Sequence, residues 1–343
     1  MAMVPALPRS VASNPKFLSQ LAEAHRLRAA EPLDERHKVK YPFVPRQPVV
    51  LEGDDWTAAS STLATTIRQA LGLSCPLDRL HGTLPDFSPR ADAHQRVMAS
   101  KLQLLRPLAD PATAAPFLAA YDALVADVVA PHVAALVAAA DGDLRCDCLH
   151  YAAFPTLRVQ TPSSSRATIR PHFDGMYGLQ PGSLNFWLPL TDVRGASALW
   201  LESDAKARGG ASRDGCGSTA PTEAADGAGV AEAAAAKAAH TYTYHPLTRA
   251  SLFDGRSTIH FTIPNRSPRT RVSLDFRVVP GPLFDAQSRL ARLGYYSTCE
   301  RGGSSQGDSR GGGRGGGRGF RKAASGRLSK LHGIPHEGRP VAE

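Results

Sequence analysis

The spacing of apolar residues separates a helical part of the chain from a part rich in strands. Within residues 56–140, apolar side chains recur near i, i+3, i+4 and i+7 over 57–71, 91–105 and 110–140. This repeat is typical of amphipathic helices, because it places the apolar residues on one face. Proline inside the third stretch, as at Pro131, indicates a helix start or a kink. The region therefore predicts three or four helices.

After residue 143 the pattern changes to short apolar and aromatic runs separated by turn residues. These runs cover 148–154, 156–160, 182–191, 198–202, 241–244, 250–254 and 271–278. Each has the length of a strand, and the turn signals between them indicate an all-β sandwich or barrel. With the helices that precede it, this pattern predicts an α+β fold in which N-terminal helices pack on the β part.

Three stretches lack such a pattern. Residues 205–239 are almost entirely Ala, Gly, Ser, Thr and charged residues, which predicts a low-complexity surface insertion. Residues 1–55 carry many prolines and several charges, so we expect a poorly ordered or extended N-terminal segment. Residues 301–343 are rich in Arg and Gly and predict a disordered tail. One domain is thus expected over residues 56–300.

The formal net charge of +9 lies mostly in the tail. From Arg301 to the end there are nine Lys or Arg residues against three Asp or Glu residues, a balance of +6. The rest of the chain is only mildly basic, which argues against a basic catalytic groove. The run Gly311–Gly319 could contact RNA or acidic partners without sequence selectivity, but a solvated tail is the favoured interpretation.

No part of the sequence indicates a membrane or a secretory protein. We find no apolar run of transmembrane length and no secretory signal. The five cysteines are odd in number and scattered, at positions 75, 146, 148, 216 and 299. The Cys146-x-Cys148 spacing is too short for a zinc knuckle and has no partner pair. Reduced thiols in a cytoplasmic protein are expected, with organelle import left open by the early Arg and Lys residues.

The motif His172-Phe-Asp174 is the strongest candidate for metal chemistry. In an extended strand, side chains at i and i+2 project from the same face, so this imidazole and carboxylate would point into one space. A second imidazole, His260, follows far downstream. Two His and one carboxylate on one face of a metal form the usual site of non-haem Fe(II) oxygenases. In the alternative interpretation, His172 caps a turn and Asp174 is a solvated loop acid.

The strand after His260 adds a candidate anion clamp. Residues 271–278 alternate without a break, with Val272 and the apolar residues on one face and Arg271 and Ser273 on the other. Arg offers a planar fork for a carboxylate, and Ser adds a hydroxyl donor beside it. A dicarboxylic cosubstrate that chelates the metal at one end would need such a clamp at the other. The alternative is a half-buried sheet whose polar face is wet.

Several segments together resemble one family. They are His172–Gly178, Asn185–Asp192, Ala198–Ser203, Phe253–Gly255, His260, Asn265 and Thr270–Arg277. The combination resembles the streptomycin-biosynthesis-type branch of the 2-oxoglutarate/Fe(II) dioxygenases, akin to the phytanoyl-CoA dioxygenase group, and covers about residues 148–280 without the insertion. The resemblance implies a double-stranded β-helix, or jelly roll, with iron near one mouth.

The resemblance also implies roles for single residues. His172, Asp174 and His260 would ligate Fe(II) as the catalytic metal site. Arg271, helped by Ser273, would bind the far carboxylate of 2-oxoglutarate. Enzymes of this kind decarboxylate 2-oxoglutarate with O2 to succinate and CO2 and usually hydroxylate a C–H bond.

Further residues refine this expectation. Tyr177 and Asn185 are candidates for the cosubstrate pocket, and Asn185 could instead hydrogen-bond a metal ligand. Trp187 is a lesser candidate, with core packing the favoured alternative. Related halogenases lack the carboxylate ligand, so the presence of Asp174 favours hydroxylation. Phe261 stands where relatives often have glycine, and a bulky ring there could reshape the mouth of the site.

The expected function is therefore an Fe(II)- and 2-oxoglutarate-dependent dioxygenase that hydroxylates a small organic molecule. The alternative from another class is a catalytically inactive jelly-roll protein that binds a metal or a ligand. The sequence does not identify the substrate.

Overall fold

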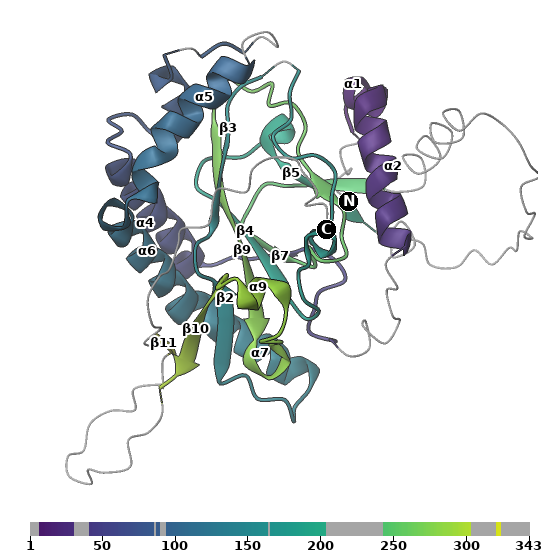
Figure 1. Ribbon diagram of the computed structural model, residues 1–343, viewed down its shortest axis with the longest axis vertical. Helices are drawn as coiled ribbons and strands as arrows, with labels where there is room; N and C mark the ends of the chain where they lie inside the picture. Colours follow the sequence, from purple (N-terminus) through teal and green to yellow (C-terminus); the bar gives the residue numbers. More distant parts are fainter. Residues whose placement is uncertain are drawn as a thin grey trace, which may run out of the picture.

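The computed structural model describes residues 7–30, 41–85, 87–89, 94–163, 165–203, 243–302 and 320–323. In this part of the chain, helices lie along one face of a large antiparallel sheet, and a smaller antiparallel sheet packs on its other face (Figure 1). This arrangement confirms the predicted mixture of helices and antiparallel strands. Two apolar cores result, one on each face of the large sheet.

The helices between residues 54 and 140 cover the outer face of the large sheet. They are α4 (Asp54–Ala70), η1 (Leu77–Thr83), α5 (His94–Leu105), η3 (Arg106–Ala109), α6 (Pro111–Leu124), the π turn η4 (Val125–Val129) and α7 (Ala130–Ala140). Their buried apolar residues share one core with the sheet, as the periodicity predicts. Asp110 caps α6, because its carboxylate accepts a hydrogen bond from the Thr113 backbone N–H at 2.8 Å.

The helical run Pro111–Ala140 contradicts the expectation that no apolar run of the chain has transmembrane length. Among the described residues it is the one helical stretch long and apolar enough to cross a membrane by length and composition. Its apolar side chains are used in packing, since Phe117, Tyr121 and Val133 are fully buried in the core. Core packing therefore accounts for the composition of this helix.

The large sheet has the strand order β1-β7-β4-β9-β2-β10-β11, and all neighbours are antiparallel. Its strands are β1 (Val49–Val50), β7 (Ser251–Phe253), β4 (Leu184–Pro189), β9 (Arg271–Pro280), β2 (Cys148–Ala152), β10 (Tyr296–Arg301) and β11 (Phe320–Lys322). An eighth strand, β3 (Thr156–Gln160), pairs with the first half of β9. The central strand β9 thus contacts β2, β3 and β4.

The two faces of β9 enter different environments, and both are buried. On the outer face, Phe276 stacks on Phe186 of β4 with ring centroids 5.3 Å apart and meets Tyr121 of α6 edge-on at 5.3 Å. On the inner face, Arg271 and Ser273 are 1% and 0% exposed. The polar face of this strand is therefore enclosed by protein rather than wet.

The small sheet closes over that inner face. Its central strand β5 (Leu199–Ser203) lies between β6 (Thr243–Leu247) and β8 (His260–Phe261). Its apolar residues share the second core with Trp187 and Phe253 from the inner face of the large sheet. Trp187 packs in this core, which is the interpretation favoured from the sequence. The space between the sheets is thus where inward side chains of both meet.

The N-terminal segment forms helices, which contradicts the expectation of a poorly ordered or extended segment. Helices α1 (Arg9–Ala12) and α2 (Pro15–Ala30) lie against the small sheet. The Phe17 ring of α2 meets Phe261 of β8 edge-on, with centroids 5.0 Å apart. Phe261 therefore anchors α2 rather than reshaping the mouth of the site, because adjacent residues of a strand point to opposite faces. The helix is hard to detect from sequence because it buries little besides Leu21 and Ala24.

The chain forms further elements after the predicted jelly roll ends at residue 280. The described elements are η8 (Gly281–Leu283), α9 (Arg289–Arg292), β10 and β11. Strand β11 pairs with β10 and lies inside the predicted tail, which is thus not disordered throughout. The predicted insertion at 205–239 and the Arg/Gly run at 311–319 lie outside the described residues.

A buried ion pair between α2 and the small sheet gives a stability prediction. Arg28 Nη2 donates to Glu202 Oε1 at 3.0 Å, and the two side chains are 17% and 7% exposed. An Arg28→Gln variant is expected to lose on the order of 3 kcal/mol of unfolding free energy, because it leaves the Glu202 charge buried without its guanidinium. The matched control is Arg26→Gln, which removes an exposed pair with Glu23 and should leave stability unchanged. Urea unfolding measures both, and equal effects would contradict this packing.

Candidate metal centre

Three side chains with metal-binding atoms converge between the two sheets. One potential ligand atom from each of His172, Asp174 and His260 lies within 4.8 Å of the others. The Asp174 Oδ1 atom is 3.5 Å from His172 Nε2 and 3.8 Å from His260 Nε2. All three side chains are buried. The arrangement brings two imidazoles and one carboxylate to one point, as the sequence predicts, and this donor set suits Fe(II) with open positions left for other ligands.

A short antiparallel contact between distant parts of the chain produces this convergence. The His172 N–H donates to the His260 carbonyl at 3.2 Å, and the His260 N–H donates back to the His172 carbonyl at 2.8 Å. Phe173 is extended (φ −124°, ψ 147°), so Asp174 projects on the same side as His172. The Asp174 N–H then donates to the Gly255 carbonyl at 2.7 Å, where the 3-10 turn η5 (Asp174–Tyr177) begins.

Both imidazoles are oriented by backbone carbonyls. His172 Nδ1 lies 2.8 Å from the Arg170 carbonyl oxygen, and His260 Nδ1 lies 2.9 Å from the Thr258 carbonyl oxygen. A carbonyl oxygen only accepts hydrogen bonds, so each Nδ1 must carry the proton and donate it. This assignment leaves the Nε2 lone pair of each ring for a metal, which is the usual arrangement of metal-binding histidines.

The second oxygen of Asp174 is held away from the metal position. Asp174 Oδ2 accepts from Asn185 Nδ2 at 2.5 Å, from Arg277 Nε at 3.1 Å and from Arg277 Nη2 at 2.8 Å. The other oxygen, Oδ1, faces the two histidines. Asp174 therefore has one oxygen free to face a metal, and Asn185 contacts this candidate ligand.

The charge states of the ligands suit metal binding. Burial disfavours the ionised carboxylate, but Arg277 and the two imidazoles outweigh it and hold the pKa of Asp174 well below its usual range. Burial, aided by neighbouring His172, lowers the pKa of His260 to about 4. At neutral pH the site thus offers an ionised carboxylate and a neutral His260 imidazole, which are the forms that bind metals.

Arg271 and Ser273 are buried, and some of their donor groups have no partner among the described residues. Arg271 Nη1 donates to the Ser197 carbonyl at 3.3 Å, in the 3-10 turn η6 (Gly195–Ser197). Within the described residues, Arg271 Nε, Arg271 Nη2 and Ser273 Oγ have no hydrogen-bond partner. Burial lowers the pKa of Arg271 to about 10, so the side chain stays charged at neutral pH. Unpaired buried donors of this kind are costly, and a carboxylate would satisfy them. These residues fit the far end of a dicarboxylate.

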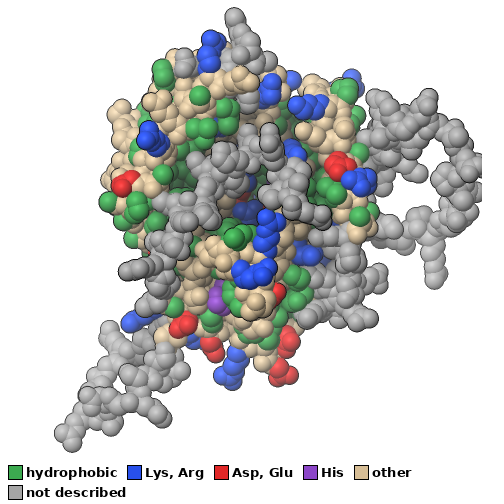
Figure 2. Space-filling model, viewed as in Figure 1, with side chains coloured by type: hydrophobic (Ala, Val, Ile, Leu, Met, Phe, Trp, Pro, Cys, Tyr) green, Lys and Arg blue, Asp and Glu red, His purple; other side chains and the backbone are tan. Residues whose placement is uncertain are grey.

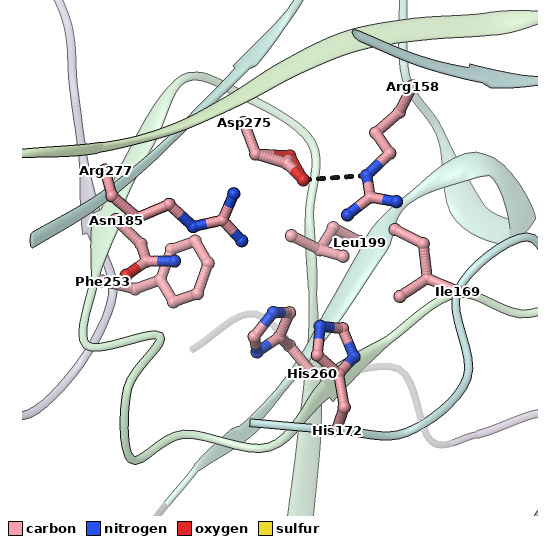
Figure 3. A pocket seen from close by; sticks show the side chains of 9 residues that line it. All are labelled: Arg158, Ile169, His172, Asn185, Leu199, Phe253, His260, Asp275 and Arg277. Atoms are coloured by element: carbon pink, nitrogen blue, oxygen red, sulfur yellow. Dashed lines mark hydrogen bonds and ion pairs between the residues drawn. The ribbon is translucent and has the colours of Figure 1, made fainter. Parts of the chain in front are cut away.

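A cavity opens beside the two histidines (Figure 3). Its lining residues are Arg158, Ile169, His172, Asn185, Leu199, Phe253, His260, Asp275 and Arg277. In Figure 3 the two imidazoles lie on one side of this space, and the pair formed by Asp275 and Arg158 lies opposite them. Arg271 is not among the residues that line it.

Tyr177 lies at the margin of the site rather than inside it. Its side chain is 46% exposed, and its ring centroid is 5.5 Å from that of His172. The Arg170 Nη2 group donates to its hydroxyl at 3.5 Å. Tyr177 therefore lies beside His172 at the surface, and it does not line the cavity.

The sequence reasoning missed three charged residues of the site. Asp275 and Arg277 continue the inner face of β9 beyond Arg271 and Ser273, so the same alternation could have identified them. Arg158 lies on β3 opposite Ser273, a pairing that no local pattern reveals.

Gly255 provides a test of how Asp174 is positioned. A Cβ atom at Gly255 would lie 2.2 Å from Asn185 Nδ2 and 2.3 Å from its Cγ. A Gly255→Ala variant is thus expected to displace the Asn185 amide from Asp174 and to weaken metal affinity about tenfold. Calorimetric titration with Mn(II) measures this loss. In an Asn185→Ala background the same substitution should cost little, and full additivity of the two effects would contradict the mechanism.

The chain is similar to one curated protein and to several solved structures. No protein-family model matches the chain. The streptomycin biosynthesis protein StrG of Streptomyces griseus is 26% identical over 177 residues, which are 50% of this chain and 69% of StrG. A solved structure of the non-heme alpha ketoglutarate dependent epimerase SnoN from nogalamycin biosynthesis is 15% identical, with 90% of this chain and 99% of SnoN covered at a TM-score of 0.33. The non-heme monooxygenase ThoJ in complex with Ni is 15% identical, with 70% and 76% covered at a TM-score of 0.31.

The StrG match and the geometry of the candidate metal site each agree with an expectation from the sequence. The match agrees with the resemblance drawn from the motifs around the candidate ligands. His172, Asp174 and His260 then converge in the structure.

Proposed function

We propose that this relative of StrG is an Fe(II)- and 2-oxoglutarate-dependent dioxygenase that hydroxylates a small organic molecule. The observation that carries the proposal is the convergence of His172, Asp174 and His260 at one buried point. Arg271 Nε, Arg271 Nη2 and Ser273 Oγ have no partner among the described residues, which gives independent support for a dicarboxylic cosubstrate.

The arrangement of the sheets supports a double-stranded β-helix as the scaffold. Two antiparallel sheets pack with their inner faces together, and the candidate ligands lie between them. His260 comes from the small sheet, whereas Asn185 and Arg277, which hold Asp174, come from the large one. Such a scaffold positions a site with residues from strands that are far apart in sequence.

The reaction proposed consumes one 2-oxoglutarate, one O2 and one C–H group and yields succinate, CO2 and an alcohol. When bound, the ferrous ion and 2-oxoglutarate supply the oxidising chemistry with O2. His172, His260 and Asp174 would hold the ion with one atom each. Asp174 would supply the carboxylate ligand that the related halogenases lack, so its presence favours hydroxylation.

The other residues of the site would orient the cosubstrate and Asp174, and would keep water away from the metal ligands. Arg271 Nε and Nη2, with Ser273 Oγ, would bind the far carboxylate of 2-oxoglutarate and fix its direction. Asn185 and Arg277 keep Asp174 in place and ionised. The ring centroids of Phe253 and His260 are 5.4 Å apart. Phe253 is one of the apolar lining residues that would restrict the access of water to the metal ligands.

Succinate release tests this proposal without knowledge of the substrate. The full chain is incubated with Fe(II), ascorbate, O2 and 2-oxoglutarate, and succinate is measured over time. We expect slow uncoupled formation of succinate that a metal chelator abolishes. Binding of metal and 2-oxoglutarate with no succinate above the chelated control would instead support the inactive binding protein.

A further inference from the structure

We infer that Arg158 forms a subsite for a carboxylate group of the substrate, at the end of the cavity opposite the metal ligands. The inference rests on the proposed function for the identity of the reacting end. The subsite itself is argued from Arg158, its partner Asp275 and the cavity they line.

The strand register places Arg158 on the inner face of the large sheet. Arg158 of β3 lies directly opposite Ser273 of β9, and directly opposite residues of neighbouring strands project to the same side. Its guanidinium therefore lies on the same face as the Arg271 and Ser273 side chains. Unlike Arg271, Arg158 lines the open cavity together with His172.

One side of the Arg158 guanidinium is fixed by Asp275. Arg158 Nε donates to Asp275 Oδ2 at 2.9 Å, and the two side chains are 23% and 14% exposed. The two terminal nitrogens extend past Asp275 toward the cavity and lie near Leu199 (Figure 3). Asp275 thus orients the guanidinium and leaves its terminal N–H groups for a ligand. A planar carboxylate accepts two parallel hydrogen bonds from such a fork.

The charges around the cavity leave this role to Arg158. Arg277 is engaged with Asp174 through Nε and Nη2. Arg271 lies outside the cavity lining and carries the donors assigned to the cosubstrate. Of the two described arginines that line the cavity, Arg158 is then the one whose terminal nitrogens face the space left for the substrate. On the face shown in Figure 2, several Lys and Arg side chains lie near the centre of the view, and most acidic side chains lie toward the lower edge, with others at the left and right.

An ion pair without a ligand is a poor explanation for this arrangement. Placing Arg158 and Asp275 between two sheets removes both charges from most of the surrounding water, and apolar residues of similar volume would often serve stability equally well. A bound carboxylate gives the pair a use, because it adds two charge-assisted hydrogen bonds and a fixed distance from the metal ligands.

Matched acid and amide probes test the subsite. The probes are benzoate with benzamide, cyclohexanecarboxylate with cyclohexanecarboxamide, and indole-3-acetate with indole-3-acetamide. Their dissociation constants are measured by ligand-observed NMR on the full chain, with Zn(II) and 2-oxoglutarate present and again without them. We expect the wild-type protein to bind the acid of at least one pair about tenfold more tightly than its amide.

Variants assign that preference to one arginine. Arg158→Gln should abolish the preference for acids and change the affinity for 2-oxoglutarate less than about twofold. Arg158→Lys keeps the charge beside Asp275 but lacks the fork, so it should retain part of the preference and shows that the fold survives. Arg271→Gln should weaken 2-oxoglutarate binding and leave the preference in place. Arg145→Gln, at an exposed position, is the matched control and should change neither.

The outcomes separate this inference from the proposed function. No binding of any probe, equal binding of acid and amide, or a preference that survives in Arg158→Gln would overturn the subsite. A loss of 2-oxoglutarate binding in Arg158→Gln would overturn it as well, because Arg158 would then hold the cosubstrate. Failure of the wild-type protein to bind metal and 2-oxoglutarate would contradict the proposed function instead. The probe affinities measured without Zn(II) and 2-oxoglutarate would still show whether Arg158 binds carboxylates.

Discussion

Replacing Asp174 with alanine is expected to weaken Fe(II) binding by more than about 100-fold and to abolish succinate release. The carboxylate supplies the single anionic ligand atom between the two imidazoles, at 3.5 Å and 3.8 Å from their Nε2 atoms. Loss of a residue that merely orients a ligand costs about 10- to 100-fold in metal affinity, so loss of the ligand should cost more. Calorimetric titration with Mn(II) and the succinate assay measure the two effects.

The same substitution is expected to affect stability, and the control must account for it. Asp174→Ala leaves Arg277 buried without its carboxylate, which we expect to cost about 3 kcal/mol of unfolding free energy. Asp174→Asn keeps the shape of the side chain and should fold better while it still binds metal poorly. Asp192→Asn, at an acid that pairs with Arg194 on the surface, should leave metal binding unchanged. Full metal affinity in a folded Asp174→Asn protein would argue against the metal centre.

Replacing Arg271 with methionine is expected to raise the dissociation constant for 2-oxoglutarate about 100-fold and to leave metal affinity unchanged. The guanidinium offers Nε and Nη2, which have no hydrogen-bond partner among the described residues, to the far carboxylate. In the absence of 2-oxoglutarate, the variant should be as stable as the wild-type protein or more stable, because it removes a buried charge with two nitrogens, Nε and Nη2, that have no partner among the described residues. This expectation differs from the usual result, because the replacement of a fully buried side chain is ordinarily destabilising.

Thermal unfolding with and without 2-oxoglutarate measures both parts of this prediction. The cosubstrate should raise the melting temperature of the Mn(II)-loaded wild-type protein and not that of Arg271→Met. Arg269→Met is the matched control, since Arg269 is half exposed and pairs with Asp78 at 3.5 Å. Equal stabilisation of Arg271→Met and the wild-type protein by 2-oxoglutarate would show that another residue holds the cosubstrate.

Much of the scaffold could be predicted from local patterns. The helical period over 57–71, 91–105 and 110–140 anticipates the helices that cover the large sheet, and the strict alternation of 271–278 anticipates its central strand. The pair His172 and Asp174 was found because two residues on one extended segment share a face. These features depend on neighbours in sequence, so the sequence displays them.

The remaining features depend on contacts between distant segments. Helix α2 was missed because few of its residues are buried, and its place is set by Phe17 against Phe261. Arg158 enters the site only through the pairing of β3 with β9. Asp275 and Arg277 were visible as polar residues of β9, but nothing local shows that this face is enclosed by a second sheet.

Anomalous diffraction at the iron edge, from crystals loaded with Fe(II) without oxygen, tests the central claim most directly. The account predicts one strong anomalous peak at an iron position about 2.1 Å from each of three atoms: His172 Nε2, His260 Nε2 and one oxygen of Asp174. A peak held by other residues, or one that reaches fewer than all three of these side chains, would contradict it.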